Sequence, residues 1–305
     1  MPPAQSGKTN QIRAIEVITL DSLQDNKPLC IVGTSQGAVF AVPTEGALVP
    51  QLIFQDETLN IVTSIATTKT LISLDGAHSQ TLLALGLSDG EVVLLLIDRP
   101  LEQSESTFTC TTLSRIKVSD IKILNVYLLA EQSTDKTFCV DLLASNGRTE
   151  LIRTSLSLER MEGQYRLVSA QSGTFTVGIK TQYICIQLMT PSVLVAGDTK
   201  GNIFVFDYQA PGEAYQQLKA HKNERVISLY YCQTTHQLYS TSKDNYINLY
   251  RLSPETSRPR LSKTTSLKEE DLNVIQCLSI HSGRRLIMLG FYGNYAYLWN
   301  KQDHQ

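Results

Sequence analysis

Residues 220–252 read AHKNERVISLYYCQTTHQLYSTSKDNYINLYRL and hold three apolar runs separated by short polar segments. The first run begins at Val226, and the second carries Leu238. The third alternates apolar residues with Asn248 and Tyr250, which we expect on the opposite face. Runs of this length joined by Asp- and Asn-containing turns predict an antiparallel meander. Because such a meander buries one face well, it predicts that similar sheets pack beside it.

The same strand–turn–strand pattern occurs five more times. It lies at residues 28–42, 82–98, 138–154, 193–208 and 286–299. The turn glycine or asparagine falls at positions 37, 90, 147, 201, 245 and 294, so the steps are 53, 57, 54, 44 and 49 residues. Units of about 40–50 residues with four strands each are typical of β-propeller blades. The sequence therefore predicts an all-β propeller with six clearly encoded blades, and its length permits a seventh nominal position.

The overall composition is that of a globular protein, with 305 residues, 42% hydrophobic and 18% charged, and a formal charge of −2. We expect residues 1–11 to be a flexible lead-in, residues 12–300 to form a single propeller domain, and residues 301–305 to be a tail. The longest apolar run, residues 92–97, is shorter than the roughly 20 residues that span a bilayer. Because the N-terminus also lacks a signal-peptide core, we expect an intracellular protein of the cytoplasm or nucleus, with no membrane partner.

Segments between the patterned runs carry polar residues, proline or glycine. Such composition predicts loops at residues 99–106 and 156–164. The basic stretch 251–268 predicts a flexible linker, with contact to phosphate or to an acidic partner as the less favoured interpretation.

The six cysteines are spread along the chain, with no two closer than 29 positions, so no zinc-binding Cys-x-x-Cys pair is present. Four of them, Cys30, Cys139, Cys185 and Cys232, lie in apolar runs. A free cysteine in such a run behaves as a small buried hydrophobe, which fits a reducing compartment.

Residues 220–252 resemble a repeat of the WD-repeat family of β-propellers. The family pattern is Gly-His, an apolar strand, a Ser-x-Ser-x-Asp-Gly-like turn, and a strand ending in Trp-Asp. This chain has Ala220-His221, then STSKDN at residues 240–245, then Tyr250-Arg251. The resemblance extends along most of the chain as a period, but it is specific only from about residue 193 to 300.

The resemblance implies a buried hydrogen-bonded network within one blade. Its members would be His221, Asp244, Ser240 or Ser242, and Tyr250. Such a network stabilises a fold only when every member finds a partner. A catalytic acid–base pair of His221 with Asp244 is the less favoured alternative, because both residues fall where a blade of this family needs them.

Blade count and ring closure stay open at this level. Some WD-repeat scaffolds of vesicle coats and nuclear pores are open six-bladed propellers completed by strands from a partner, and six patterns suit that arrangement. Closure within the chain would instead require residues 14–20, or a strand just before them, to pair with the sheet that contains Trp299.

No other motif predicts chemistry. The chain has no HxH or HExxH spacing, no Gly-x-Ser-x-Gly and no phosphate-binding GxxxxGK[ST] loop. We therefore expect no catalytic residue, no metal site, no cofactor and no small-molecule substrate.

Propellers of this family crowd one face with the residues that lead into the inner strands and those just ahead of the middle turn. In this chain the resemblance places there Arg225, Lys243, Tyr292, Asn273, Thr199, Ser88 and Ser145. Arginine and tyrosine are favoured at protein interfaces, so Arg225 and Tyr292 are the first candidates for partner contacts.

The sequence thus predicts a non-enzymatic WD-repeat scaffold subunit that mediates protein–protein interactions within a multi-subunit complex. One alternative is a propeller subunit of an RNA-processing or chromatin complex that contacts nucleic acid directly. The near-neutral charge disfavours nucleic-acid binding by this chain alone, so any such contact is expected to be indirect. The other alternative is an enzyme built on a propeller.

Overall fold

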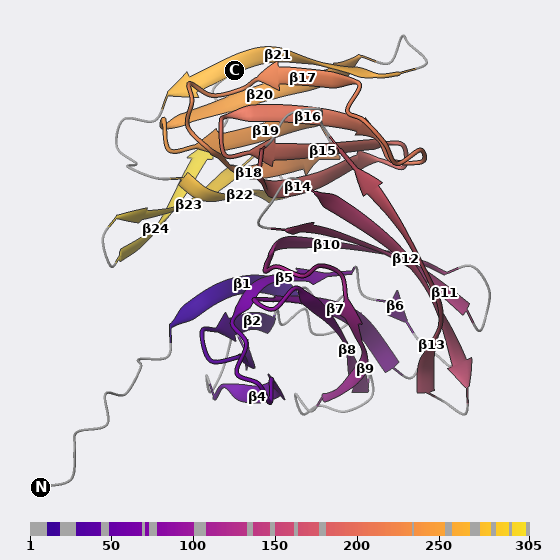
Figure 1. The fold of residues 1–305 in the computed structure, drawn as a ribbon. Helices are drawn as coiled ribbons and strands as arrows, with labels where there is room; N and C mark the ends of the chain where they lie inside the picture. Colours follow the sequence, from indigo (N-terminus) through magenta and orange to yellow (C-terminus); the bar gives the residue numbers. More distant parts are fainter. Residues whose placement is uncertain are drawn as a thin grey trace, which may run out of the picture. The chain divides into compact units, whose positions relative to one another are not determined.

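Figure 1 shows the fold of the chain in a computed structural model. The structure describes residues 11–18, 29–43, 49–68, 71–72, 78–100, 108–132, 137–146, 150–161, 164–176, 181–233, 235–253, 258–268, 275–281, 285–292 and 295–302. Every regular element within these ranges is a β-strand, which confirms the all-β prediction. None of the described residues belongs to a helix that could cross a membrane.

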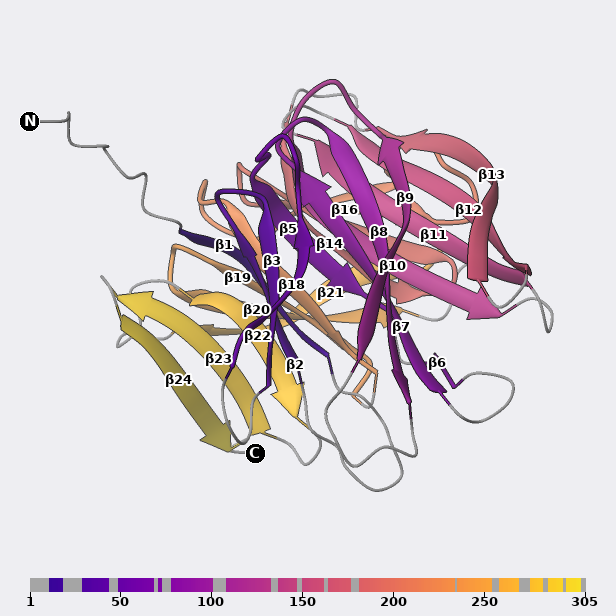
Figure 2. The same cartoon turned by 90° about the horizontal axis from the view of Figure 1, so that it is seen from below.

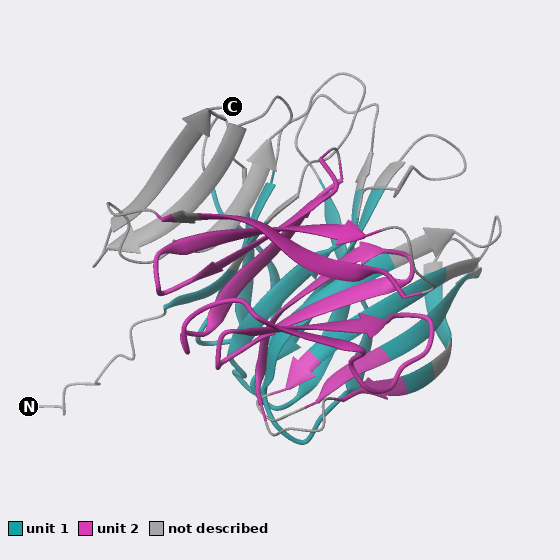
Figure 3. Cartoon of the chain, turned by 90° about the horizontal axis from the view of Figure 1, so that it is seen from above, with its two compact units in different colours: residues 1–144, 154–172 teal, residues 145–153, 173–305 magenta. Residues whose placement is uncertain are grey.

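The chain divides into two compact units (Figure 3). Residues 1–144 and 154–172 make up the first unit, and residues 145–153 and 173–305 make up the second. The described strands of both units form antiparallel sheets in which strands consecutive in the sequence pair with each other, except that β5 pairs with β7 rather than β6.

The first sheet of the first unit has the order β1-β2-β3-β4, with bounds Ile12–Ile18, Leu29–Thr34, Ala38–Pro43 and Gln51–Gln55. The second has the order β5-β7-β8-β9, and the short strand β6 also pairs with β7. Their bounds are Val62–Thr67, His78–Leu87, Glu91–Pro100 and Thr109–Lys117, and Leu71–Ile72 for β6. The third has the order β10-β11-β12-β13, and parts of β11, β12 and β13 belong to the second unit. Its strands are Ile123–Gln132, Thr137–Asn146, Leu151–Met161 and Gln164–Phe175.

The second unit holds the remaining sheets. One has the order β14-β15-β16-β17, with bounds Tyr183–Thr190, Val193–Asp198, Asn202–Asp207 and Gln216–Lys219. The next, β18-β19-β20-β21, has bounds Val226–Cys232, Gln237–Ser242, Tyr246–Ser253 and Arg260–Lys268. In the last, β22-β23-β24, the bounds are Ile275–His281, Arg285–Tyr292 and Tyr295–Gln302.

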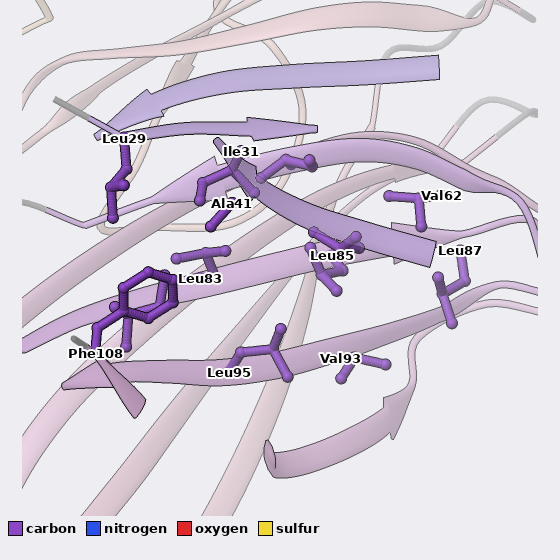
Figure 4. Packing of buried hydrophobic residues seen from close by; sticks show 13 residues of the cluster. Leu29, Ile31, Ala41, Val62, Leu83, Leu85, Leu87, Val93, Leu95 and Phe108 are labelled. Carbon is purple, nitrogen blue, oxygen red and sulfur yellow. The ribbon is translucent and has the colours of Figure 1, made fainter. Parts of the chain in front are cut away.

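Within each unit the sheets pack through their first strands. Strand β5 contacts both β1 and β10 in the first unit, and β18 contacts both β14 and β22 in the second. Figure 4 shows the resulting core between the first two sheets, where Ile31 of β2 and Leu85 of β7 lie among other aliphatic side chains. Burial of such side chains, at about 25 cal/mol for each Å² removed from water, is the main driving force for this stacking.

Burial on both faces of the central strands differs from the alternation expected at residues 238–252. Every residue of β19 from Leu238 to Ser242 is buried, and in β20 Ile247, Asn248 and Tyr250 are all buried. The reason is that the sheet β18–β21 has a neighbouring sheet on either side, so neither face of its central strands meets water.

The turn between the second and third strand of a sheet has the backbone that its sequence predicts. Gly37, Gly90, Gly201 and Asn245 have φ angles of 74°, 89°, 80° and 63°. Glycine and asparagine adopt this left-handed region at the lowest cost, so the prediction is confirmed at these four turns. The predicted turn positions 147 and 294 lie outside the described residues. Figure 2, turned from Figure 1, gives a second view of the strands that these turns connect.

Three loop or burial predictions were wrong. Strand β12 runs to Met161 and β13 begins at Gln164, so residues 156–161 are not a loop. Residues 260–268 of the predicted linker form β21, which pairs with β20 along its length. In β21 the exposed side chains lack the alternating apolar pattern by which inner strands are recognised, whereas β12 continues past its buried Leu156 and Leu158 into the polar residues that suggested a loop. Cys139, expected in the core, is exposed on β11, whereas Cys185 and Cys232 are buried.

Candidate functional site

The side chain of His221 joins the segment ahead of β18 to the turn between β19 and β20. Its Nδ1 atom lies 3.0 Å from both carboxylate oxygens of Asp244, and its Nε2 atom lies 2.8 Å from the hydroxyl of Ser240. Because a carboxylate can only accept, the neutral ring donates from Nδ1 to Asp244 and accepts the Ser240 hydroxyl at Nε2. The sheet therefore uses both ring nitrogens internally.

Solvent does not reach the imidazole, since the side chain of His221 has 0% relative exposure while that of Asp244 has 12%. Burial lowers the pKa of His221, and the nearby charge of Asp244 opposes this shift without cancelling it. The ring is thus neutral under ordinary conditions. This geometry can hold the segment and the turn together, but it offers no ring nitrogen to a substrate.

Asn248 also takes part in this network, and sequence reasoning missed it. Its side-chain amide donates to the carbonyl of Ala220 at 2.6 Å and accepts the hydroxyl of Ser266 at 2.5 Å. It is 1% exposed and lies on β20. A lone asparagine between two aliphatic residues in a strand was the available signal, because a buried amide needs partners.

The other two expected members contribute less. The Ser242 hydroxyl accepts the N–H of Asp244 at the long distance of 3.5 Å. Burial raises the pKa of Tyr250 to about 12. The Tyr250 hydroxyl lies beside Ser240 and Asn248 but makes no well-formed hydrogen bond within the part of the chain that the structure describes.

A second buried carboxylate serves the sheet β14–β17. Asp198 is fully buried and accepts the hydroxyl of Thr181 at 2.7 Å. Its other oxygen accepts the backbone N–H of Asn202 at 2.7 Å and that of Lys200 at 2.8 Å. The carboxylate thereby holds the turn before β16. In the neighbouring sheet the carboxylate of Asp244 holds the equivalent turn, before β20.

In the first unit, the guanidinium of Arg115 on β9 binds three carboxylates. It lies 2.7 Å from Asp56 and 3.3 Å from Asp89, and it also contacts Glu91. Burial alone would raise the pKa of Asp56, but hydrogen bonds from Thr58, the Asn60 N–H and Arg115 outweigh it and hold that pKa below its usual value. This cluster fastens the segment after β4 to the turn before β8.

Two residues of the predicted partner-binding face lie side by side and exposed. Strand register pairs Val226 with Ser242. Arg225 precedes Val226 and Lys243 follows Ser242, so both residues lie at the same end of β18 and β19. Both side chains are exposed, and neither forms an ion pair with a carboxylate of the described residues. Two unpaired cations at neighbouring backbone positions form a local positive patch.

The remaining residues of that predicted face are placed differently. Ser88 is half-buried, and its hydroxyl accepts the N–H of Ile61 at 3.0 Å. Thr199 is half-buried, and Ser145 is fully buried in β11, so Ser145 does not belong to an exposed face. Tyr292 ends β23, where it pairs with Tyr295. Asn273 lies outside the described residues.

Comparison with known proteins supports the fold. No protein-family model matches the chain, and no curated protein sequence matches it. Among solved structures, the crystal structure of the β-propeller domain of Cps50 (Swd1) from Myceliophteria thermophila is similar, with a TM-score of 0.57 and 12% sequence identity. The match covers 95% of this chain and 83% of that one. Together with the antiparallel four-stranded sheets and their repeated turns, this similarity shows that the chain has a β-propeller fold.

Proposed function

We propose that this chain is a non-enzymatic scaffold subunit that binds other proteins of a multi-subunit assembly inside the cell. The observation that carries the proposal is the exposed pair Arg225 and Lys243, which the register of β18 and β19 holds side by side. Arginine in particular combines apolar area with several directed hydrogen bonds, and it is enriched where proteins meet.

The patch selects an acidic partner. Lys222 is also exposed next to Arg225, and the exposed Glu224 is the one acidic side chain in the segment 222–225. Lys222, Arg225 and Lys243 stand against Glu224 and the half-buried Asp244, which gives three positive and two negative charges. The net charge of +1, with all three cations exposed, favours an aspartate- or glutamate-containing segment of another protein.

The buried network supports the absence of acid–base chemistry at His221. We propose that His221, Ser240, Ser242, Asp244 and Tyr250, together with Asn248, have a structural role. The complete burial of the imidazole supports this assignment, because a general acid or base must come within hydrogen-bond distance of its substrate. We retain Thr199, Ser88, Tyr292 and Asn273 as proposed contributors to partner contacts around the patch.

The test is quantitative affinity purification of the tagged full chain from its own cells, followed by mass spectrometry. The double variant Arg225→Glu/Lys243→Glu should lose proteins that the unmodified chain recovers in stoichiometric amounts. A matched control is Lys122→Glu/Arg166→Glu, which reverses two exposed cations of the first unit and changes the net charge equally. The control should recover the same proteins as the unmodified chain.

Two outcomes would reject the proposal. One is recovery of no stoichiometric protein partner by the unmodified chain. The other is tight, salt-sensitive binding of purified chain to RNA or DNA that the double variant abolishes, since this would assign the patch to nucleic acid. Equal recovery by the double variant and the control would show that the patch is not the docking site.

A further inference from the structure

Leu59 has an unusual backbone and an unusual exposure. It lies in the loop of residues 56–61 between β4 and β5, with a φ of 56° and a relative exposure of 61%. A positive φ is uncommon for any residue with a side chain, and it is a clear exception for a bulky aliphatic one. Leu59 is therefore a conformational outlier whose side chain points into solvent.

The second unit contains the same loop with a different residue at this position. The N–H of Asp56 donates to the turn carbonyl of Gly37 at 2.9 Å, and the N–H of Ala220 donates to that of Gly201 at 2.9 Å. Six residues after each of these donors, the next sheet begins, at Val62 and Val226. Counting from the donors, Leu59 therefore corresponds to Asn223.

Asn223 shows what the position requires. Its φ is 57°, almost the value at Leu59, and its side-chain carbonyl accepts the ammonium of Lys219 at 2.7 Å. Asparagine tolerates the left-handed region because its short polar side chain bonds locally, whereas leucine meets the full steric penalty. The exposed leucine also buries little apolar surface in this chain. Neither backbone strain nor hydrophobic burial within the fold accounts for a leucine at position 59.

The loop holds Leu59 in place before any partner arrives. The buried carboxylate of Asp56 accepts the hydroxyl of Thr58 and the N–H of Asn60, both at 2.7 Å. The Asn60 side chain donates to Asp89 at 2.6 Å, and the Leu59 N–H donates to the Asp56 carbonyl at 3.1 Å. A loop whose backbone is held in this way loses little conformational entropy on binding, which favours affinity.

Charge around the loop indicates the partner's chemistry. The charged residues of the Leu59 loop, of the turn before β8 and of the adjoining strands are four carboxylates and two cations. They are Asp56, Glu57, Asp89 and Glu91, and Arg115 and Lys117. Four negative and two positive charges leave a net charge of −2. The equivalent loop and turn of the second unit, which carry Arg225 and Lys243, have a net positive charge. A surface that fits the Leu59 loop is therefore basic and would not fit the positive patch.

We propose that Leu59 is the apolar anchor of a second protein-docking site, which inserts into an apolar pocket rimmed by lysine or arginine on a partner protein. This rests on the proposed scaffold function and adds to it a site distinct from the positive patch. Central apolar anchors of this kind carry a large share of the binding energy at interfaces.

The first measurement needs only the purified full chain. Leu59→Asn should raise the melting temperature by about 2–4 °C, because it relieves the strain. The control Leu52→Asn replaces an exposed leucine of β4, 52% exposed, whose backbone is that of an ordinary strand, so it should bring no such rise.

The second measurement identifies the partner. A photo-crosslinking amino acid at position 59 of the full chain is activated in its own cells, and mass spectrometry locates the linked site on the adduct. The purified partner is then titrated with each variant. Leu59→Asn should weaken binding at least about tenfold and Glu57→Lys several-fold, while Leu52→Asn should leave the affinity unchanged.

Several results would overturn the inference. They are a lower melting temperature for Leu59→Asn, unchanged partner affinity, a crosslinked site that is acidic or polar, or adducts formed only between copies of this chain. If Leu59→Asn keeps every partner while Arg225→Glu/Lys243→Glu loses them, only this inference fails. If the unmodified chain binds no protein at all, the scaffold proposal fails with it.

Discussion

The side-chain amide of Gln216 pairs with both backbone groups of Leu261. Its Nε2 atom donates to the Leu261 carbonyl at 2.8 Å, and its Oε1 atom accepts the Leu261 N–H at 2.9 Å. These residues belong to β17 and β21, the outer strands of neighbouring sheets in the second unit. Gln216 thus pairs the outer backbone groups of β21, as a further strand at that edge would. The hydroxyl of Tyr215 adds a hydrogen bond to the carbonyl of Pro259 at 2.8 Å.

Removing this pair should weaken the second unit. Gln216→Ala leaves the Leu261 N–H and carbonyl without that partner in a partly buried place, so the free energy of unfolding should fall by about 1–2 kcal/mol. Chemical denaturation measures this. Gln217→Ala is the control, because Gln217 is the exposed neighbour on the same strand. Equal effects of both substitutions would contradict a special role for the pair.

Loss of the carboxylate beside His221 should also destabilise the fold. Asp244→Ala leaves the Nδ1–H of a buried imidazole without an acceptor, and it removes the acceptor that lies 3.1 Å from the Tyr246 N–H. We expect the free energy of unfolding to fall by about 1–3 kcal/mol, well beyond the effect of Asp120→Ala at an exposed aspartate. Thermal unfolding distinguishes the two variants. A change below about 0.5 kcal/mol, the usual effect of a surface substitution, would argue against the network.

The buried imidazole predicts a pH dependence. Because the pKa of His221 is lower in the folded chain than in the unfolded chain, the unfolded state binds more protons in mildly acidic solution. Stability due to the neutral ring is therefore complete above the unfolded pKa of about 6.5 and declines as the pH falls toward the folded pKa. Unfolding free energies measured between neutral and mildly acidic pH should show this decline in the unmodified chain.

His221→Gln should flatten that decline, since glutamine does not titrate. The exposed His236 supplies a control, and His236→Gln should leave the slope close to that of the unmodified chain. A slope that survives His221→Gln would assign the acid sensitivity to groups other than this imidazole.

The two kinds of turn residue should differ in how strongly substitution affects stability. A Cβ atom at Gly201 would lie 2.6 Å from the His221 carbonyl oxygen and 2.7 Å from that of Glu224, in addition to the strain at a φ of 80°. Gly201→Ala should therefore lower the unfolding free energy by about 2 kcal/mol or more.

Asn245→Gly should be nearly neutral, within about 0.5 kcal/mol, because glycine adopts the same left-handed backbone. It also removes a buried side-chain oxygen that has no hydrogen bond among the described residues. Denaturation of both variants in parallel gives the comparison. A neutral Gly201→Ala would contradict the close approach of the two carbonyl groups.

Periodicity in the sequence was sufficient for the class of fold and for its repeated turns. Turn residues such as Gly37, Gly90, Gly201 and Asn245 are recognisable because a left-handed backbone restricts the choice of residue locally. Outer strands such as β21 escaped prediction, because their exposed threonine, serine and lysine residues carry no apolar alternation. The number of blades, the closure of a ring and the extent of a single domain over residues 12–300 stay predictions.

The candidate site divides in the same way. The sequence by itself determined the all-strand repeat, because the alternation of residues along strands and the turn residues recur at a regular period. Its resemblance to the WD-repeat family implied that His221 lies beside Asp244. Only the tertiary structure decided that Asn248 joins them, that Ser145 is buried, and that Leu59 and Asn223 share a left-handed backbone. Those features depend on which sheets pack together and on how the segments between them are held, and no local pattern of residues encodes such long-range contacts.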